Sequence, residues 1–254
     1  KYCMAAYING DIAGLAAWGW GVRSRSTPHH LFGEAGKFQD YLELCRFFVY
    51  DWCPKNTASQ FLSVTHRIIK KYAPWIKWLY TYAAVVQGMT GGIYQAANYD
   101  YIGRRLCNSF VYIPNMGLVH NVTLWERYGN ISGSSNGSLR KLRQFIPNVM
   151  RWCGYNFRYI FWLCDQKEKE RLMEGAQFQI LPYPTPADLE IWLEDENGLH
   201  KPISVEFART IPIVRLPSRR QICAGSIDSD ASAIHAGEGG ASPTPALQSS
   251  LISY

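Results

Sequence analysis

Runs of apolar residues predict several strands in the first half of the chain. Residues 4–20 form two apolar runs around Asn9-Gly10, a dipeptide typical of a two-residue hairpin turn, and therefore predict a β-hairpin. Further apolar runs predict strands over 42–50, over 76–83 and through 110–113. Between the strands we expect both helices and polar connections.

Apolar residues recur at helical spacing after Pro54 and stop at Pro74, which predicts a helix with Asn56 or Thr57 as its N-cap. Thr57 and Gln60 have the spacing of a capping box. We expect its solvated outer face to carry His66 and the basic residues Arg67, Lys70 and Lys71. A short helix is expected within 87–98, and a polar loop over 23–39. This alternation predicts an α/β (α+β) fold, a mixed sheet with helices on both faces.

The second half contains a less regular series of segments. We expect a loop over 129–139, a basic helical segment from 139 to Pro147, a strand over 155–163, a helix over 165–174, a strand over 178–181 and a hairpin over 186–217 that turns at Asn197-Gly198. Residues 221–254 are rich in Ser, Gly and Ala and poor in aromatics, which predicts a disordered tail. We thus expect a main domain over 1–184, a β-rich extension over 185–220 and the tail.

The composition narrows the class of protein and suggests its partners. Residues 1–220 hold all 26 Lys and Arg but only 17 of the 20 Asp and Glu, a balance of +9. Such a surface is either ordinary solvated surface or a site for nucleic acid or a CoA-type polyphosphate. The basic residues cluster as Arg23 with Arg25; Arg67 with Lys70 and Lys71; Arg104 with Arg105; and Arg140, Lys141 and Arg143 with Arg151.

Two absences in the sequence indicate a cytoplasmic protein. No apolar run is long enough to cross a bilayer, and the seven Cys include no CxxC pair. The adjacent His29 and His30 have no Cys or carboxylate at metal-ligand spacing, so no metal site is predicted there. The chain starts at Lys1 within strand-like sequence, and we expect a fragment that lacks its true N-terminus. The sequence sets no oligomeric state.

The strand over 76–83 leads into a glycine-rich turn with Gly88, Thr90 and Gly91. Glycine lets a ligand approach the backbone closely, and a helix start presents unpaired N–H groups. Tyr94 lies one turn further on, where its phenol could face such a ligand. Gln95 and Asn98 either read a base edge or stabilise the short helix.

Several motifs carry a resemblance to a known family. These are Pro54-Lys55-Asn56-Thr57-Ala58-Ser59, the run from Gln87 to Asn98, Tyr101-x-Gly103, Arg158-Tyr159-Ile160-Phe161 and Leu181-Pro182-Tyr183-Pro184. Over about residues 1–184 the chain resembles the phage Mom proteins, DNA-modifying relatives of the GNAT acyltransferases. The resemblance implies modification of adenine N6 with a methylcarbamoyl group, which protects phage DNA from restriction in the host cytoplasm. The implied partners are double- or single-stranded DNA and acetyl-CoA or a related acyl-CoA; iron is implied by the family alone.

The resemblance also implies a place for each group. A GNAT-like sheet would splay the 42–50 and 76–83 strands apart to admit the pantetheine of acyl-CoA, and the helix start near Asn56 would receive its pyrophosphate. By position, Arg46 and Tyr94 match the catalytic residues, with Tyr94 giving a proton to the leaving thiolate. The implied cofactor-binding residues are Lys55, Asn56, Thr57, Ser59, Gly88, Thr90 and Gly91.

The sequence departs from the family at the end of the 76–83 strand. Ala84 stands where the family carries an acidic residue, and Met89 stands where it carries a histidine. Either another carboxylate, such as Asp51 or Asp100, replaces the missing acid, or the chain is a catalytically silent DNA-binding protein. A GNAT enzyme acting on a small amine or a protein is the third alternative.

Overall fold

The computed structural model describes all residues except 22–24, 122, 125–141, 196 and 215–254. A ten-stranded sheet, with main order β1-β2-β3-β4-β7-β5-β6-β10 and with β8 and β9 attached to β7, runs through the molecule. The strands are β1 (Tyr2–Ile8), β2 (Asp11–Gly19), β3 (Tyr41–Val49), β4 (Trp78–Ala83), β5 (Asp100–Ile113), β6 (Gly117–His120), β7 (Met150–Trp162), β8 (Ile191–Glu194), β9 (His200–Pro202) and β10 (Ile213–Val214). The helices are α1 (Ser26–Phe32), α2 (Thr57–Tyr72), α3 (Gly92–Ala96), α6 (Gln166–Glu174) and α7 (Val205–Thr210), with 3-10 turns η1 (Gly33–Ala35), η2 (Phe38–Asp40), η3 (Val85–Gln87) and η4 (Pro186–Asp188).

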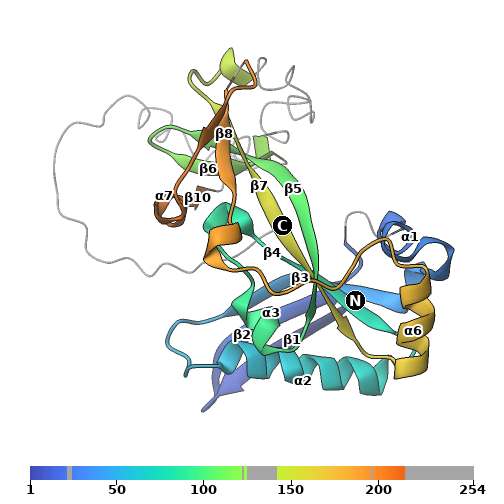
Figure 1. The fold of residues 1–254 in the computed structure, drawn as a ribbon. Helices are drawn as coiled ribbons and strands as arrows, with labels where there is room; N and C mark the ends of the chain where they lie inside the picture. Colours follow the sequence, from blue (N-terminus) through green and yellow to red (C-terminus); the bar gives the residue numbers. More distant parts are fainter. Residues whose placement is uncertain (22–24, 122, 125–141, 196, 215–254) are drawn as a thin grey trace, which may run out of the picture.

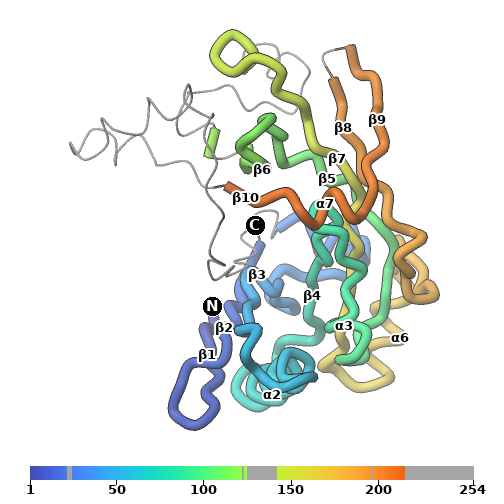
Figure 2. The backbone as a smooth tube through the Cα atoms, turned by 90° about the vertical axis from the view of Figure 1, so that its left-hand side faces the viewer, coloured from blue at the N-terminus to red at the C-terminus, as the bar shows by residue number. Residues whose placement is uncertain are grey.

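Two long strands, β5 and β7, connect the lower and upper parts of the molecule (Figure 1). The lower part holds β1 to β4 with α2 beneath them, and the upper part holds β6, β8, β9, β10 and α7 (Figure 2). The pairs β3–β4 and β6–β10 are parallel and the other strand pairs are antiparallel. The expected mixed α+β sheet is therefore confirmed.

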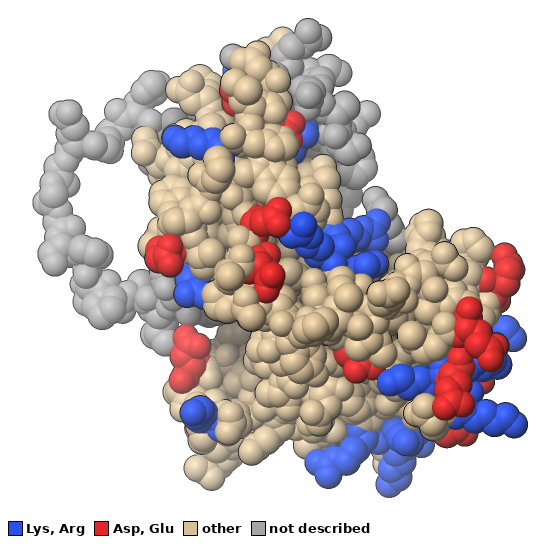
Figure 3. Space-filling view, in the orientation of Figure 1, with Lys and Arg blue, Asp and Glu red and all other residues tan. Residues whose placement is uncertain are grey.

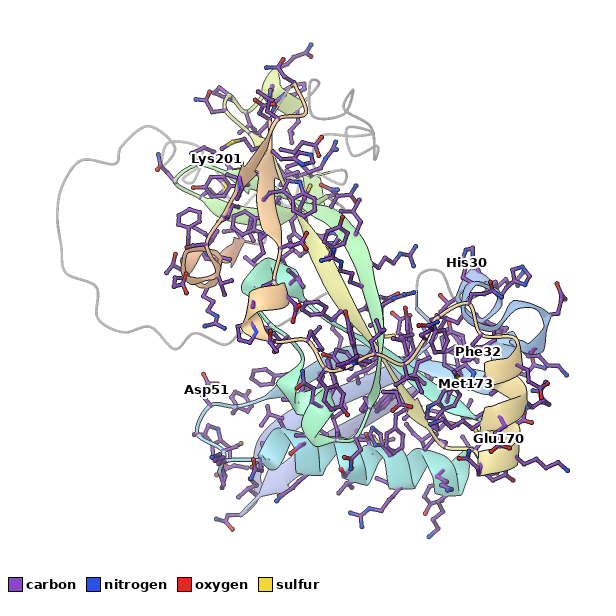
Figure 4. The ribbon with its side chains drawn as sticks, viewed as in Figure 1. His30, Phe32, Asp51, Glu170, Met173 and Lys201 are labelled. Carbon is purple, nitrogen blue, oxygen red and sulfur yellow. The ribbon has the colours of Figure 1, made fainter. Side chains whose placement is uncertain are left out.

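Helices cover both faces of the lower sheet. On one face, Leu62 and Ile69 of α2 are fully buried in the same core cluster as Leu42 and Leu79 of the sheet. On the other face, Phe32 of α1 lies edge-on to Trp78, with ring centroids 5.0 Å apart. Figure 4 shows α1 and α6 side by side on that face, at the labels of Phe32 and Met173.

The N-terminal hairpin shows how directly a turn sequence can determine local structure. Asn9 and Gly10 both have positive φ, 53° and 94°, as a type I′ turn requires. The turn joins β1 and β2 as an antiparallel pair, with Ile8 opposite Asp11. The predicted hairpin is confirmed.

Three predictions in the first half are wrong. The expected loop over 23–39 contains helix α1, because Leu31 and Phe32 are buried against the sheet. The expected capping box of α2 is absent, since Asn56 has φ 70° and no side chain caps the helix. His66 is 4% exposed rather than solvated, and its Nε2 lies 2.8 Å from the Tyr99 hydroxyl.

The second half differs from its prediction mainly in extent. Residues 178–181 form only an isolated bridge between Tyr101 and Leu181, and they belong to the connection from α6 to the upper part of the fold. The hairpin expected over 186–217 is limited to β8 and β9, and α7 and β10 follow it. The basic segment before Pro147 is described only from residue 142. The expected loop over 129–139 and the expected tail over 221–254 lie outside the described residues.

The expected boundary at residue 185, between a main domain and a β-rich extension, stays a prediction. In the described residues, β8 pairs with β7 and β10 pairs in parallel with β6. The segment after 185 is thus hydrogen-bonded into the same sheet as the segment before it.

Candidate active site

A cleft opens where two parallel strands separate. β3 and β4 pair at only three positions, the last being Glu43 opposite Tyr80, although both strands continue beyond that point. The cleft between them has a volume of about 1350 Å³ and is lined by β3, β4, the turn over 87–94 and the segment over 208–213. The divergence of these strands, expected from the resemblance, is present in the sheet.

The cleft reaches both faces of the sheet. Thr81 and Tyr82 are neighbours in β4, so their side chains point to opposite faces, and both line the cleft. Tyr94 lies on the face covered by α2, and Glu43 lies on the opposite face. Two ligands could therefore enter the gap from opposite sides and meet between the strands.

A β-bulge in β3 directs two charged side chains to the same face. Ala17 of β2 pairs with Arg46 and Trp18 pairs with Leu44, so Cys45 is the extra residue. Without the bulge, Glu43 and Arg46 would point to opposite faces because side chains alternate along a strand. With it, both line the cleft on the face away from α2.

Arg46 is exposed, and its Nη1 donates to the Cys45 carbonyl oxygen at 2.7 Å. Burial and, to a smaller degree, the charge of Arg46 lower the pKa of His120 in β6. Among the described residues, no carboxylate forms an ion pair with Arg46. Its charge is thus available to an anionic ligand in the cleft.

Tyr94 forms part of the cleft wall from helix α3. It is 8% exposed, and its ring packs against Tyr99 and Tyr159 at centroid distances of 5.5 and 5.4 Å. Burial raises the pKa of Tyr94, and a hydrogen bond with the Thr81 side chain opposes this rise. The phenol therefore keeps its proton at neutral pH.

The glycine-rich turn is held tightly by its neighbours. Gly91 has φ 86°, and a Cβ atom there would lie 2.7 Å from the Tyr159 ring. Gly88 has φ 68°, and its carbonyl oxygen accepts a hydrogen bond from Arg209 of α7 at 3.2 Å. Gly88, Thr90 and Gly91 all line the cleft. The turn is therefore a closely packed wall of the cleft.

Gln95 and Asn98 have local structural roles. The Gln95 amide donates to the Thr90 carbonyl at 3.4 Å and to the Tyr159 hydroxyl at 3.3 Å. Asn98 has φ 60° just beyond α3. These contacts favour stabilisation of the short helix over reading of a base edge. α3 has five residues and lies within the expected range 87–98, which confirms the short helix.

The resemblance implies that the start of α2 binds the pyrophosphate of acyl-CoA, but only part of this helix start lies at the cleft. Thr57 donates to the Pro54 carbonyl at 2.7 Å, and Ser59 donates to the Asn56 carbonyl at 3.1 Å. The cleft lining includes Ala58 but none of the predicted Lys55, Asn56, Thr57 and Ser59. Asp51, labelled in Figure 4, lies in the connection before α2 and also lines the cleft.

Glu43 is the candidate residue that sequence reasoning missed. Burial raises the pKa of its carboxyl to about 7, while the charge of Arg105 opposes this rise. Asp100, considered as a replacement acid, instead pairs with Lys169 at 3.1 Å and accepts from Trp162, and it does not line the cleft. The sequence signal that could have identified Glu43 is its position as a single carboxylate in the otherwise mostly apolar strand β3.

The basic clusters differ in their surroundings. Figure 3 shows Lys and Arg along the lower edge, over α2, and a second group beside the middle of β5. Arg104 pairs with Glu190 and lies over the Tyr155 ring. Arg151 does not belong to a surface cluster, because it is 7% exposed and pairs with Glu194. Arg23, Arg140 and Lys141 lie outside the described residues.

The described part of the chain contains no group of three His, Cys, Asp or Glu that could hold a metal ion. The iron implied by the family resemblance stays a prediction. His29 and His30 are exposed on α1, with His29 3.8 Å from Glu34. Within the same residues, no helix is both long and apolar enough to cross a membrane.

Comparison with known proteins gives this cleft a family context. The sequence profile of the Mom protein family matches residues 1–185. The chain is also 24% identical over 181 residues to the methylcarbamoylase Mom of Escherichia phage Mu, an alignment that covers 71% of this chain and 70% of the phage protein. The expected relation to the GNAT acyltransferases stays a prediction. Because the family match covers well over half of its residues, the chain belongs to the Mom protein family.

Proposed function

We propose that this protein is a DNA-modification enzyme that transfers a methylcarbamoyl group to the N6 amino group of adenine. The name of its phage Mu relative supports the transferred group. The observation that carries the proposal is the cleft where β3 and β4 separate after three pairs. A cleft with two open faces suits a reaction between a bound donor and a DNA base.

The donor in this proposal is an acyl-CoA-type thioester. Its linear pantetheine arm would lie between the diverging strands, where β4 beyond Tyr80 has no β3 partner among the described residues. The backbone groups on that edge can hydrogen-bond with the amides of the arm. Ala58 brings the first turn of α2 to the cleft, and the N–H groups of a helix start favour a pyrophosphate.

Two residues of the cleft have proposed chemical roles. Arg46 stabilises the negative charge that develops on the carbonyl oxygen during attack. Tyr94 protonates the leaving thiolate, since its phenol is neutral and lines the cleft. The adenine must leave the base stack to enter the cleft, or the substrate must be single-stranded.

Mass spectrometry of nucleosides tests the proposal. DNA from cells that express the complete protein should contain methylcarbamoylated deoxyadenosine, and DNA from cells that express Arg46→Ala should contain little or none. Glu170→Gln on α6 provides a matched control, because Glu170 is exposed and far from the cleft (Figure 4). Unmodified DNA from cells with folded wild-type protein would contradict the proposal.

Ala84 favours a second candidate function, that of a catalytically silent DNA-binding protein. It occupies the position of the family's acidic residue and is 4% exposed at the end of β4. This candidate predicts DNA binding by the purified protein without any modified nucleoside. The two functions are therefore separated by the same experiment together with a binding measurement.

A further inference from the structure

The side chain of Glu43 lies at the point where the cleft begins. Glu43 is the last β3 residue paired with β4, and the bulge at Cys45 places it on the same face as Arg46. Tyr82, two residues beyond the Glu43 partner Tyr80, lines the cleft on that face as well. A ligand that enters from this face would meet the carboxylate where the strands separate.

Glu43 lacks the partners that other partly buried carboxylates have. Asp100 pairs with Lys169 and Glu194 pairs with Arg151, at 3.1 and 3.2 Å. No hydrogen bond or ion pair of the Glu43 side chain occurs within the part of the chain that the structure describes. Because leaving a charge unpaired in a partly buried site costs free energy, a role in binding or catalysis would explain its presence.

The segment before α1 leaves space for this carboxylate. A Cβ atom on Gly21 would lie 2.0 Å from Glu43 Oε2 and 2.5 Å from Oε1. Glycine at position 21 therefore lets the carboxylate pack directly against the backbone. Any larger residue there would displace the end of the Glu43 side chain from this position.

The surroundings of Glu43 contain few charges. Arg105 of β5 is the cation that opposes the rise of its pKa, which burial brings to about 7. The phenols of Tyr80 and Tyr82 in β4 and the thiol of Cys45 also face this region, and burial raises the pKa of each. The remaining groups that act on these neighbours are Tyr41, Arg46, Arg158 and Lys1. Burial thus brings the pKa of the Glu43 carboxyl close to neutral pH, whereas it moves the pKa of the two phenols and of the Cys45 thiol further above neutral pH.

We propose that Glu43 is the general base that accepts the proton from the attacking amino group of the DNA base. This inference rests on the proposed function and supplies the carboxylate that Ala84 does not provide. It also assigns the two faces of the cleft: the thioester lies towards α2 and Tyr94, and the base enters on the face of Glu43 and Arg46.

The proposed transfer is balanced in atoms and electrons. The lone pair of N6 forms the new N–C bond to the thioester carbonyl carbon, and the C–S bond breaks with its electron pair on sulfur. Glu43 accepts one proton from N6, and Tyr94 gives one proton to the thiolate. The products are the acylated adenine and free CoA thiol, and no oxidant or reductant is needed. For a methylcarbamoyl product, the donor is the methylcarbamoyl thioester.

Glu43→Gln is the direct test, because it keeps the shape of the side chain and removes the basic group. We expect the rate of nucleoside modification to fall by about 100-fold or more, with an unchanged affinity for acetyl-CoA in calorimetry. The wild-type rate should rise with pH through about 7, since the base must be deprotonated, and the variant should lose this rise. Glu170→Gln should behave as wild type in all three measurements.

Gly21→Ala is a second variant, and it keeps glutamate at position 43. Its methyl group should displace the carboxylate and lower the rate by roughly tenfold or more, with little change in melting temperature. Equal activity of wild type and Glu43→Gln would overturn the assignment of Glu43 and leave the proposed function standing. A wild type that modifies no nucleoside would instead contradict the proposed function and remove this assignment with it.

Discussion

The two edges of β4 differ in how far they are paired. On the β7 side, six consecutive residues pair, from Trp78 opposite Trp162 to Ala83 opposite Phe157. On the β3 side, pairing stops at Tyr80 after three residues. The same six-residue strand thus contributes to the core along its β7 side, the closed edge, and to a cleft along its β3 side, the open edge. We conclude that stability and proposed chemistry are divided between these two edges.

Phe157→Ala tests the closed edge and should have the largest effect. Phe157 is 1% exposed, and loss of a buried aromatic ring should lower the free energy of unfolding by about 3–5 kcal/mol. Arg46→Ala on the open edge should change it by less than about 0.5 kcal/mol, because Arg46 is exposed. Chemical denaturation measures both. A similar loss in the free energy of unfolding for the two variants would contradict the division of stability and chemistry between the two edges of β4.

Acid should destabilise the closed edge through His66. Its ring stacks on Phe161 of β7 at 4.2 Å, and burial lowers its pKa from 6.5 to about 4. The folded protein therefore binds this proton less readily than the unfolded chain does. The stabilisation is complete above about pH 6.5 and is lost as the pH falls towards 4, by roughly 3 kcal/mol. His66→Gln should remove this part of the pH dependence; an unchanged profile would show that His66 is not its source.

Tyr94→Phe tests the open edge without removing the ring. If the phenol protonates the thiolate, the modification rate should fall by about 100-fold. Thr81→Val is the matched control, because it removes the partner of the Tyr94 hydroxyl and keeps the phenol. Each variant should lose about 1 kcal/mol of stability. If Tyr94→Phe modified DNA at the wild-type rate but had a lower melting temperature, the Tyr94 hydroxyl would have a structural role only.

Arg105→Gln should have the smallest effect and concerns the approach of DNA to the cleft. Arg105 acts on both Glu43 and Tyr82, so it lies on the face assigned to the base. Loss of one phosphate contact should lower the slope of log affinity against log salt by about 1. Lys169→Gln should leave the slope unchanged, because the Lys169 ammonium is already paired with the Asp100 carboxylate. If only Lys169→Gln lowered this slope, DNA would contact Lys169 and not Arg105, which would contradict the assigned approach of DNA to the cleft.

Local patterns predicted much of the scaffold. The Asn9-Gly10 turn, the 57–72 helix and the strand over 155–163 follow from turn chemistry and from periodicity, which depend only on neighbouring residues. Residues 23–39 gave no such signal, because α1 is short and is stabilised mainly by burial of Phe32 on a distant strand. His66 was misassigned for a similar reason: the residues that bury it, Tyr99 and Phe161, are far away in sequence.

The sequence by itself determined the order of the main elements, the basic balance and the resemblance that led to Arg46 and Tyr94. Only the tertiary structure decided how far β3 and β4 stay paired, and which side chains line the resulting gap. The bulge at Cys45 and the backbone at Gly21 set the position of Glu43 through contacts with other strands and segments. Periodicity within one strand cannot reveal such contacts, because strand pairing and burial are long-range properties of the folded chain.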